Sequence, residues 1–265
     1  MKIGFIGVGN MGSAIVNGYL LSGEKTDAKV FLFDTDTAKM QSLKEIGCFQ
    51  CESIEELVKN SALIVIGVKP NTFESVLPEI AKAYTPDKVL ISIAAGITIK
   101  AMEQFIGANA KIIRTMPNTP AMVCEAMTAI CRNENITDDE MKKARYIFEK
   151  IGKVCEIPEE LIHCAIGVSG SSPAYTYMYI DALTQAAIEN GMDKEQALIS
   201  AAQSVLGAAK MVLETGISPE QLRINVCSPG GTTIEAVHKL QADNFEGIVK
   251  AGFQAAVEKS KLMSK

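Results

Sequence analysis

The stretch KIGFIGVGNMG, residues 2–12, decides the fold. Its first half, Lys2–Gly7, is a short apolar run typical of a buried strand, and helical spacing of apolar residues follows over Asn10–Leu21. Between them the pattern GxGxxG allows a tight turn, close approach of a ligand to the backbone, and close packing of helix on strand. A dinucleotide pyrophosphate is therefore expected at the start of this helix. The residues predicted to bind it are Gly7, Gly9, Asn10, Met11 and Gly12.

Strand and helix patterns alternate through residues 1–158. Apolar runs predict further strands at Lys29–Asp34, Ala62–Val68, Val89–Ala94, Lys111–Met116, Ala126–Cys131 and Lys153–Ile157. Helices are expected over Thr35–Ile46, from Ser53 onward and over Thr137–Gly152, the last two starting with capping boxes completed by Glu56 and Glu140. Such alternation is typical of a doubly wound parallel sheet, so residues 1–158 are predicted to form a Rossmann-type dinucleotide-binding domain.

Residues 159–265 show only helical patterns. The predicted helices are Glu159–Ile166, Ser172–Asn190, Asp193–Thr215, a shorter one from Ser218, Thr232–Gln241 and Asn244–Met263. The helix Asp193–Thr215 is apolar around much of its circumference, which is typical of a buried helix. Because so few helices make a modest core, its burial in a dimer interface is expected. We therefore predict an α/β fold in which an all-α substrate-binding and dimerisation domain, residues 159–265, follows the Rossmann domain.

Composition excludes several classes of function. The chain has 265 residues, 48% hydrophobic and 22% charged, which is typical of a globular protein and not of a disordered one. A net charge of -5 without a basic run argues against nucleic acid as a partner. No apolar stretch free of interrupting glycines reaches the roughly 18 residues of a membrane helix, so no membrane partner is expected.

The seven cysteines indicate a reducing environment. They lie at scattered positions without the framework of a secreted protein, so a cytoplasmic location is predicted. Cys48 and Cys51 form one CxxC pair, but no second pair or nearby histidine completes a metal site. We therefore predict no metal and favour coincidental spacing over a redox or zinc role.

Asp34 bears on the choice of cofactor. It follows Gly12 by about 20 residues and ends the second predicted strand, where an acidic residue binds the adenosine ribose hydroxyls of NAD. Its charge would repel a 2′-phosphate, and Lys39 is the nearest cation. Alternatively, Asp34 only caps the helix expected from Thr35. The position favours NADH or use of both cofactors without excluding NADPH.

Two further strand ends are expected to face the ligand, because ligands of such sheets bind at the carboxyl ends of the strands. One is Val68-Lys69-Pro70, and the other is Ala94-Ala95-Gly96. Lys69 is equally well read as a solvated loop lysine. Asn118 lies in a proline-stiffened turn after the next strand and could bond cofactor or substrate.

A second turn-to-helix stretch, VCSPGGTTIEAVHKLQ at residues 226–241, predicts an anion site. The free amides at a helix start attract an anion, and Gly230 and Gly231 permit its close approach. Hydroxyls come from Ser228, Thr232 and Thr233. The ligand that fits this site best is a small carboxylate. The alternative is an ordinary capped helix after a Ser-Pro-Gly-Gly turn.

The scarcity of acids suited to catalysis favours an imine over a ketone as substrate. Hydride transfer to a ketone normally needs a positioned His or Lys. The two histidines, His163 and His238, are expected to be packed and solvated respectively, and residues 169–181 contain no lysine. An imine nitrogen can arrive already protonated, so a threonine hydroxyl would suffice to orient it.

The motifs FIGVGNMGSAI, VKPNTF, SIAAGI, RTMPNTPA, SGSSPAY and VCSPGGTTIEAVHKL occur in this order along the chain. In these motifs the whole chain resembles the pyrroline-5-carboxylate reductases. The resemblance implies NAD(P)H-dependent reduction of L-1-pyrroline-5-carboxylate to L-proline, the last step of proline biosynthesis. It also implies a homodimer with an interlocking helical domain, often assembled into a decamer of five dimers.

The resemblance assigns roles to residues of this chain. Val68-Lys69-Pro70 and Ala94-Ala95-Gly96 would flank the nicotinamide. The substrate-binding residues would be Ser228, Gly230, Gly231, Thr232 and Thr233. Of these, Thr233 would hydrogen-bond the ring nitrogen as the catalytic residue, and the others, Thr232 through its backbone, would hold the carboxylate. Asp34 stands where members that prefer NADPH tend to carry Ser or a basic residue.

Two other functions are weighed against this one. One is a related imine or keto-acid reductase of the 6-phosphogluconate-dehydrogenase-like group. Of these, a 2-hydroxyacid or ketopantoate-type dehydrogenase would need a lysine on the long helix near residues 172–181, where none occurs. A protein that only senses a dinucleotide would keep GxGxxG but would have no reason for the SPGGTT stretch.

Overall fold

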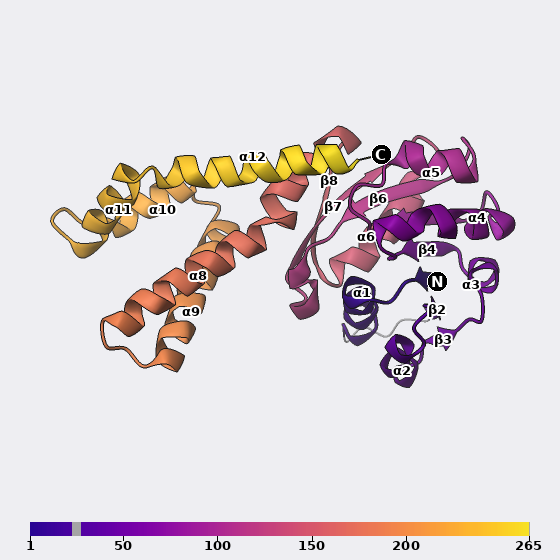
Figure 1. Cartoon of the computed structure of the whole chain (residues 1–265), viewed down its shortest axis with the longest axis horizontal. Coiled ribbons are helices and arrows are strands. Elements are labelled where there is room, and N and C mark those ends of the chain that lie inside the picture. Colours follow the sequence, from indigo (N-terminus) through magenta and orange to yellow (C-terminus); the bar gives the residue numbers. More distant parts are fainter. Residues whose placement is uncertain (23–27, 265) are drawn as a thin grey trace. The chain divides into compact units, whose positions relative to one another are not determined.

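The computed structural model describes residues 1–22 and 28–264, and the chain forms two compact units (Figure 1). The first, here called the sheet unit, comprises Met1–Ser171 and Ala256–Lys265. The second, the helical unit, comprises Ser172–Ala255. Both predicted classes of structure, a sheet with alternating helices and an all-helical part, are confirmed.

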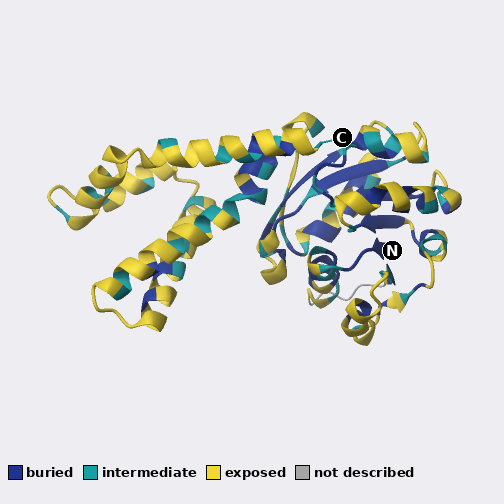
Figure 2. Ribbon diagram, in the orientation of Figure 1, coloured by how far each residue is buried: buried dark blue, intermediate teal, exposed yellow. Residues whose placement is uncertain are grey.

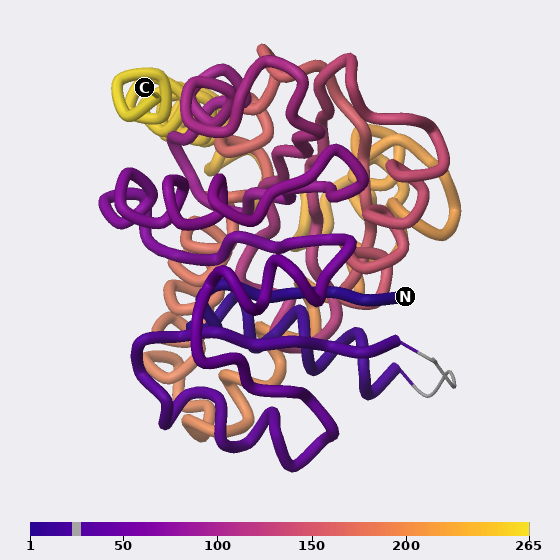
Figure 3. Tube along the Cα trace, turned by 90° about the vertical axis from the view of Figure 1, so that its right-hand side faces the viewer, coloured from indigo at the N-terminus to yellow at the C-terminus, as the bar shows by residue number. Residues whose placement is uncertain are grey.

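The sheet unit is built on an eight-stranded sheet of order β3-β2-β1-β4-β5-β6-β7-β8 within the described residues. The strands are β1 (Lys2–Ile6), β2 (Lys29–Phe33), β3 (Phe49–Gln50), β4 (Leu63–Ile66), β5 (Val89–Ser92), β6 (Ile112–Met116), β7 (Ala126–Arg132) and β8 (Gly152–Glu156). In Figure 3 the indigo first strand has later segments of the chain on both sides, as this order requires. The short β3 was not predicted.

The sheet is parallel from β3 to β6, but β7 runs antiparallel to β6 and parallel to β8. The prediction of a wholly parallel sheet is therefore wrong for the last two strands. The reason lies in the connection between β6 and β7, which holds only one 3₁₀ turn, η2 (Thr119–Val123). A parallel crossover needs a dozen or more residues, so this connection can only reverse the chain.

The helices of the sheet unit lie between its strands in the sequence. They are α1 (Asn10–Leu21), α2 (Ala38–Glu45), α3 (Ile54–Asn60), α4 (Phe73–Ala83), α5 (Ile99–Ile106), α6 (Asp138–Glu149) and α7 (Ile162–Ala165). Short 3₁₀ and π turns are η1 (Pro70–Thr72), η3 (Glu159–Leu161) and η4 (Ile166–Gly170). The capping box at Thr137 is confirmed, whereas at Ser53 only the hydroxyl caps, because Glu56 accepts from the amide of Glu52 instead.

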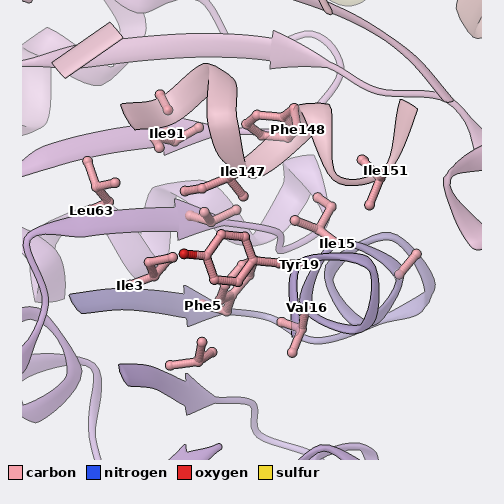
Figure 4. Close-up of a cluster of buried hydrophobic side chains, with 14 of the residues drawn as sticks. Ile3, Phe5, Ile15, Val16, Tyr19, Leu63, Ile91, Ile147, Phe148 and Ile151 are labelled. Carbon is pink, nitrogen blue, oxygen red and sulfur yellow. The ribbon is translucent and has the colours of Figure 1, made fainter. Parts of the chain in front are cut away.

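Two apolar clusters fill the faces of the sheet, because alternate strand residues point to opposite sides. Figure 4 shows one of them, which includes Phe5 of β1, Tyr19 of α1 and Phe148 of α6. The other cluster packs α3, α4 and α5 on the opposite face. Cys48 lies in the first cluster and Cys51 in the second, and burial raises the pKa of each thiol to about 11. This placement agrees with coincidental CxxC spacing.

The helical unit is poorly covered by its own residues (Figure 2). It holds α8 (Ser172–Glu189), α9 (Lys194–Thr215), α10 (Pro219–Val226), α11 (Thr232–Ala242) and most of α12 (Phe245–Met263). In α9 only Ala197 and Ala201 are buried among 22 residues. Exposed apolar side chains on α8 and α9 include Tyr177, Met178, Leu183, Leu198, Ile199, Leu206, Met211 and Leu213. By length and composition alone α9 could cross a membrane, contrary to the expectation from sequence, although one such helix is weak evidence.

Residues 159–171 pack with the sheet. Ile162 and Ala165 belong to the second core cluster, and the side-chain amide of Asn118 donates to the carbonyl of Ser169. Packing therefore divides the chain after Ser171, later than the predicted boundary between residues 158 and 159. That boundary stays a prediction about domains.

The glycines of the first turn have different structural roles. Gly7 has φ +90, and a Cβ there would lie 2.8 Å from the carbonyl carbon of Gly67. A Cβ at Gly12 would lie 2.5 Å from the carbonyl oxygen of Gly7. At Gly9, by contrast, no described heavy atom beyond its chain neighbours lies within 4 Å of an added Cβ. Packing thus requires glycine at positions 7 and 12 but not at position 9.

We expect Gly12→Ala to destabilise the protein by about 1–3 kcal/mol, because α1 must move away from the turn. Gly9→Ala is the matched control, since the same methyl group meets open space there. Its loss of helix-capping preference should cost about 1 kcal/mol or less. Thermal unfolding midpoints at one protein concentration test this, and equal midpoints for the two variants would contradict the packing argument.

Candidate functional site

Asp34 binds the glycine turn. Its Oδ2 accepts a hydrogen bond of 2.9 Å from the amide of Val8, and its Oδ1 accepts one of 2.9 Å from the amide of Asp36. Lys39 Nζ lies 3.9 Å from Oδ1. Because α2 begins only at Ala38, these bonds do not cap it, and the alternative role of Asp34 as a helix cap is wrong. The carboxylate instead joins the ends of β1 and β2.

A pocket of about 440 Å³ opens beside this carboxylate. It lies at the carboxyl ends of β1, β2 and β4, where a sheet of this type binds its ligand. Of the residues predicted from sequence, it brings together Gly7, Gly9, Asp34, Val68 and Lys69. Apolar walls come from Phe33, Ile54 and Val76. The pocket therefore offers an apolar slot whose lining also includes one carboxylate, Asp34, and two lysines, Lys39 and Lys69, which suits a nucleoside.

Other predicted residues of the turn face elsewhere. Asn10 lines a second pocket of about 480 Å³ along α1, which shares Gly9 and Lys39 with the first. Met11 packs on the first core cluster, and Gly12 is held against Gly7. Met11 and Gly12 therefore support the turn by packing against the core and against Gly7. Pro70 opens η1 and is exposed.

The loop after β5 lies outside both pockets. Ala94 is buried and its amide donates to Ser92 Oγ at 3.2 Å. Gly96 has φ +81, and a Cβ there would lie 2.8 Å from the carbonyl oxygen of Met263. Ala95 and Gly96 line a smaller pocket of about 170 Å³. That this loop flanks a nicotinamide stays a prediction.

Both ends of the Asn118 side-chain amide form hydrogen bonds with backbone groups. Its Nδ2 donates to the carbonyl of Ser169 and its Oδ1 accepts from the amide of Met127, each at 2.9 Å. It is also buried. Asn118 thus ties the turn after β6 to η4, and a contact with cofactor or substrate stays a prediction.

The predicted carboxylate site lies in the helical unit. Ser228-Pro229-Gly230-Gly231 forms a turn in which the amide of Gly231 donates to the carbonyl of Ser228 at 3.0 Å. Gly230 has φ +69, which is the conformation that a type II turn with proline before it requires. The turn thus delivers the chain to α11 with Gly231 as its N-cap.

The start of α11 carries no side-chain cap among the described residues. Ser228, Thr232 and Thr233 are exposed there. The structure therefore has a helix that follows a Ser-Pro-Gly-Gly turn with glycine at its N-cap, and an anion site at this place stays a prediction. The first amides of α11 are left for water or for a ligand.

One pair of charged residues was missed by sequence reasoning. Arg114 of β6 is buried and forms an ion pair with Glu159 of η3 at 2.8 Å. An arginine inside the otherwise apolar strand KIIRTM was the available signal. His163 Nδ1 lies 2.8 Å from Ser260 Oγ, and burial, then Arg114 and Lys261, lower its pKa. This contact agrees with a packed His163.

Comparisons with known proteins agree with this architecture. Residues 159–263 match the family model for pyrroline-5-carboxylate reductase dimerisation, and residues 2–96 match that for NADP oxidoreductase, coenzyme F420-dependent. The chain is 42% identical over 265 residues to the pyrroline-5-carboxylate reductase of Escherichia coli (strain K12), covering 100% of this chain and 98% of that protein.

Two solved structures are similar over nearly the whole chain. One is a pyrroline-5-carboxylate reductase from Coxiella burnetii, with a TM-score of 0.91 and 34% identity, covering 99% of this chain and 98% of that one. The other is Plasmodium falciparum pyrroline carboxylate reductase with NADP bound, with a TM-score of 0.87 and 32% identity, covering 100% and 98%. Full-length identity of this degree shows that the chain belongs to the pyrroline-5-carboxylate reductase family.

Proposed function

We propose that this protein reduces L-1-pyrroline-5-carboxylate to L-proline with a hydride from NAD(P)H, as the last step of proline biosynthesis. The observation that carries the proposal is the uncapped start of α11 behind a type II turn. Membership of the reductase family along the whole chain supports it further. A keto-acid reductase is disfavoured because α8 has no lysine in its first turns.

The helical unit would anchor the substrate by its carboxylate. The first amides of α11 carry the partial positive charge of the helix N-terminus and point out of the helix toward an anion. Gly230 and Gly231 remove side chains that would hold the anion away, and Ser228 adds a hydroxyl donor. Fixing the carboxylate fixes the ring attached to it. Its carbon–nitrogen double bond can then be held toward the hydride donor.

Thr233 would orient the imine nitrogen. Its exposed hydroxyl follows the turn by two residues and can hydrogen-bond the ring nitrogen while the adjacent amides hold the carboxylate. A bound NAD(P)H would supply the hydride for the imine carbon, and the nitrogen held by Thr233 would keep the proton it already carries, so that the product is an amine. The chain therefore needs no imidazole acid, in agreement with a packed His163 and an exposed His238.

The sheet unit has features that fit a dinucleotide. Glycine at position 9 is not required by packing, so the space above it is free for a pyrophosphate. The pocket beside Asp34 would take the adenosine half, with the carboxylate toward the ribose hydroxyls. Because this carboxylate would repel a 2′-phosphate, we propose a preference for NADH. The Ala94-Ala95-Gly96 loop would flank the nicotinamide half, whereas Val68 and Lys69, which the family resemblance also assigns to the nicotinamide, line the pocket proposed for the adenosine half.

The helical unit would act as a dimer. Its match to a dimerisation domain supports oligomerisation, and the exposed apolar side chains of α8 and α9 need a partner surface. Burial in a second copy would also account for the apolar character of α9 without a membrane. We extend the proposal to a homodimer that assembles into a decamer of five dimers in the cytoplasm, without nucleic acid.

Turnover tests the function directly. The purified protein should oxidise NADH or NADPH on addition of pyrroline-5-carboxylate and form proline, followed by absorbance at 340 nm. A 2-keto acid of similar size serves as the comparison and should give little oxidation. Absence of turnover with the imine would overturn the proposal.

Kinetics with both cofactors test the role of Asp34. We expect a lower KM for NADH than for NADPH. Asp34→Asn keeps an acceptor for the amide of Val8 but removes the charge, so the KM for NADPH should fall severalfold while that for NADH rises. Glu74→Gln is a charge-matched control elsewhere in the unit. A wild-type preference for NADPH would refute this use of Asp34.

Removal of one hydroxyl tests Thr233. Thr233→Ala should lower kcat about tenfold or more, the loss of one hydrogen bond in the transition state, while NADH affinity stays unchanged. Thr232→Ala is the matched control, because Thr232 is proposed to act through its backbone amide, which alanine keeps. An unchanged kcat in Thr233→Ala would remove Thr233 from the mechanism.

A further inference from the structure

We propose that Arg114 and Glu159 are positioning residues that hold the loop of residues 93–98, and that through this loop they place the nicotinamide ring for hydride transfer. The inference rests on the proposed function, in which Ala94, Ala95 and Gly96 flank that ring. Neither Arg114 nor Glu159 needs to touch cofactor or substrate. All of the contacts that carry the inference lie within the sheet unit.

The beginning of the loop is held from β5 and β6. Ser92, the last residue of β5, is fully buried, and its Oγ accepts from the amide of Ala94 at 3.2 Å. Thr115 of β6 donates its hydroxyl to the carbonyl of Ser92 at 3.0 Å. The hydroxyls of Ser92 and Thr115 therefore fix the direction in which the loop leaves the sheet.

The end of the loop is held by one carboxylate oxygen. Glu159 Oε1 accepts a hydrogen bond of 2.9 Å from the amide of Ile99, the first residue of α5. The same oxygen accepts one of 2.8 Å from Arg114 Nη1. A carboxylate at a helix start satisfies a free amide and is stabilised by the helix dipole. Glu159 thus fixes where the loop ends and α5 begins.

Arg114 and Thr115 are neighbours on β6, and their side chains leave opposite faces of the sheet. Thr115 holds the start of the loop and Arg114, through Glu159, holds its end. The exposed fraction of the Arg114 side chain is 2%, against 32% for Glu159. An arginine is rarely buried to this degree, and an ion pair that buries one of its charges gives little net stability over apolar residues of similar size. Stability therefore does not explain the presence of this ion pair, whereas placement of the loop does.

The middle of the loop rests on the end of α12. A Cβ on Gly96 would lie 2.8 Å from the carbonyl oxygen of Met263, so the two backbones are in close contact. The last turn of α12 is itself joined to α7 by the contact of His163 with Ser260. The loop is therefore fixed at its start, middle and end. A displacement of about 1 Å at a reacting centre can lower the rate about a hundredfold. A loop that is fixed in this way beside a hydride donor therefore preserves the rate of hydride transfer.

Glu159→Ala tests the inference. It should lower kcat at least tenfold with less than a twofold change in the KM for the imine. The primary deuterium isotope effect on kcat, measured with NADH deuterated at the transferred position, should rise, because a misplaced ring slows the hydride step itself. Loss of folded protein would lower kcat and leave the isotope effect unchanged. Glu159→Gln should be milder, since its amide oxygen can still accept from Ile99.

Arg114→Met extends the test, and the double variant with Glu159→Ala should be no slower than Glu159→Ala alone if the pair acts as a unit. The matched control is Glu140→Gln, which breaks the 2.6 Å ion pair to Lys111 near the other end of β6. It should leave kcat and the isotope effect unchanged.

Affinity for NADH, from its fluorescence without substrate, reports on the loop independently of turnover. Glu159→Ala should bind NADH at least threefold more weakly than wild type, whereas Glu140→Gln should not. If Glu159→Ala leaves NADH affinity and the isotope effect unchanged, the inference is overturned. Wild-type protein that binds NADH but does not reduce the imine would overturn the proposed function alone, and the affinity comparison would still decide the role of Glu159.

Discussion

The close contact between the turn after β1 and the turn after β4 is the constraint on which the sheet unit depends. A Cβ on Gly7 would lie 2.8 Å from the carbonyl carbon of Gly67, and one on Gly67 would lie 2.7 Å from the carbonyl oxygen of Gly7. Only glycines allow two strand ends to approach so closely, and Gly12 then brings α1 against the same carbonyl. The proximity of these ends creates the pocket in which Asp34, Val68 and Lys69 meet.

The two units divide the proposed chemistry between them. The sheet unit has a complete core on both faces of its sheet and a pocket suited to a dinucleotide. The helical unit has few buried residues and presents apolar helices, which is the behaviour expected of a surface that a second copy covers. Its one specialised polar feature is the start of α11, where glycines and free amides suit a carboxylate. An imine nitrogen that arrives already protonated needs no dedicated acid, so a site of this kind only has to position the substrate.

Buried polar groups in the sheet unit serve placement more than stability. Arg114, Glu159 and Asn118 all bond across gaps between elements that are distant in sequence. Both ends of the Asn118 side-chain amide are hydrogen-bonded to backbone groups. Although Asn118 lies in a turn near the expected ligand, its amide is therefore not a free donor. Glu159, although its side chain is about a third exposed, likewise bonds the amide at the start of α5. Such contacts specify which arrangement of loops is adopted, because each unpaired alternative leaves a polar group buried.

Local signals in the sequence determined the fold class, the strand–turn–helix at Lys2–Leu21, the cap at Thr137 and the turn at Ser228–Gly231. They could do so because strand periodicity, helix capping and type II turns depend on residues that lie close together along the chain. The reversal of β7 follows from its short connection to β6, whereas only the tertiary structure decided that Asp34 binds the amide of Val8 and that Arg114 reaches Glu159. These outcomes depend on which strand ends become neighbours in the folded sheet. Residues far apart in sequence meet there, and no local pattern records their meeting.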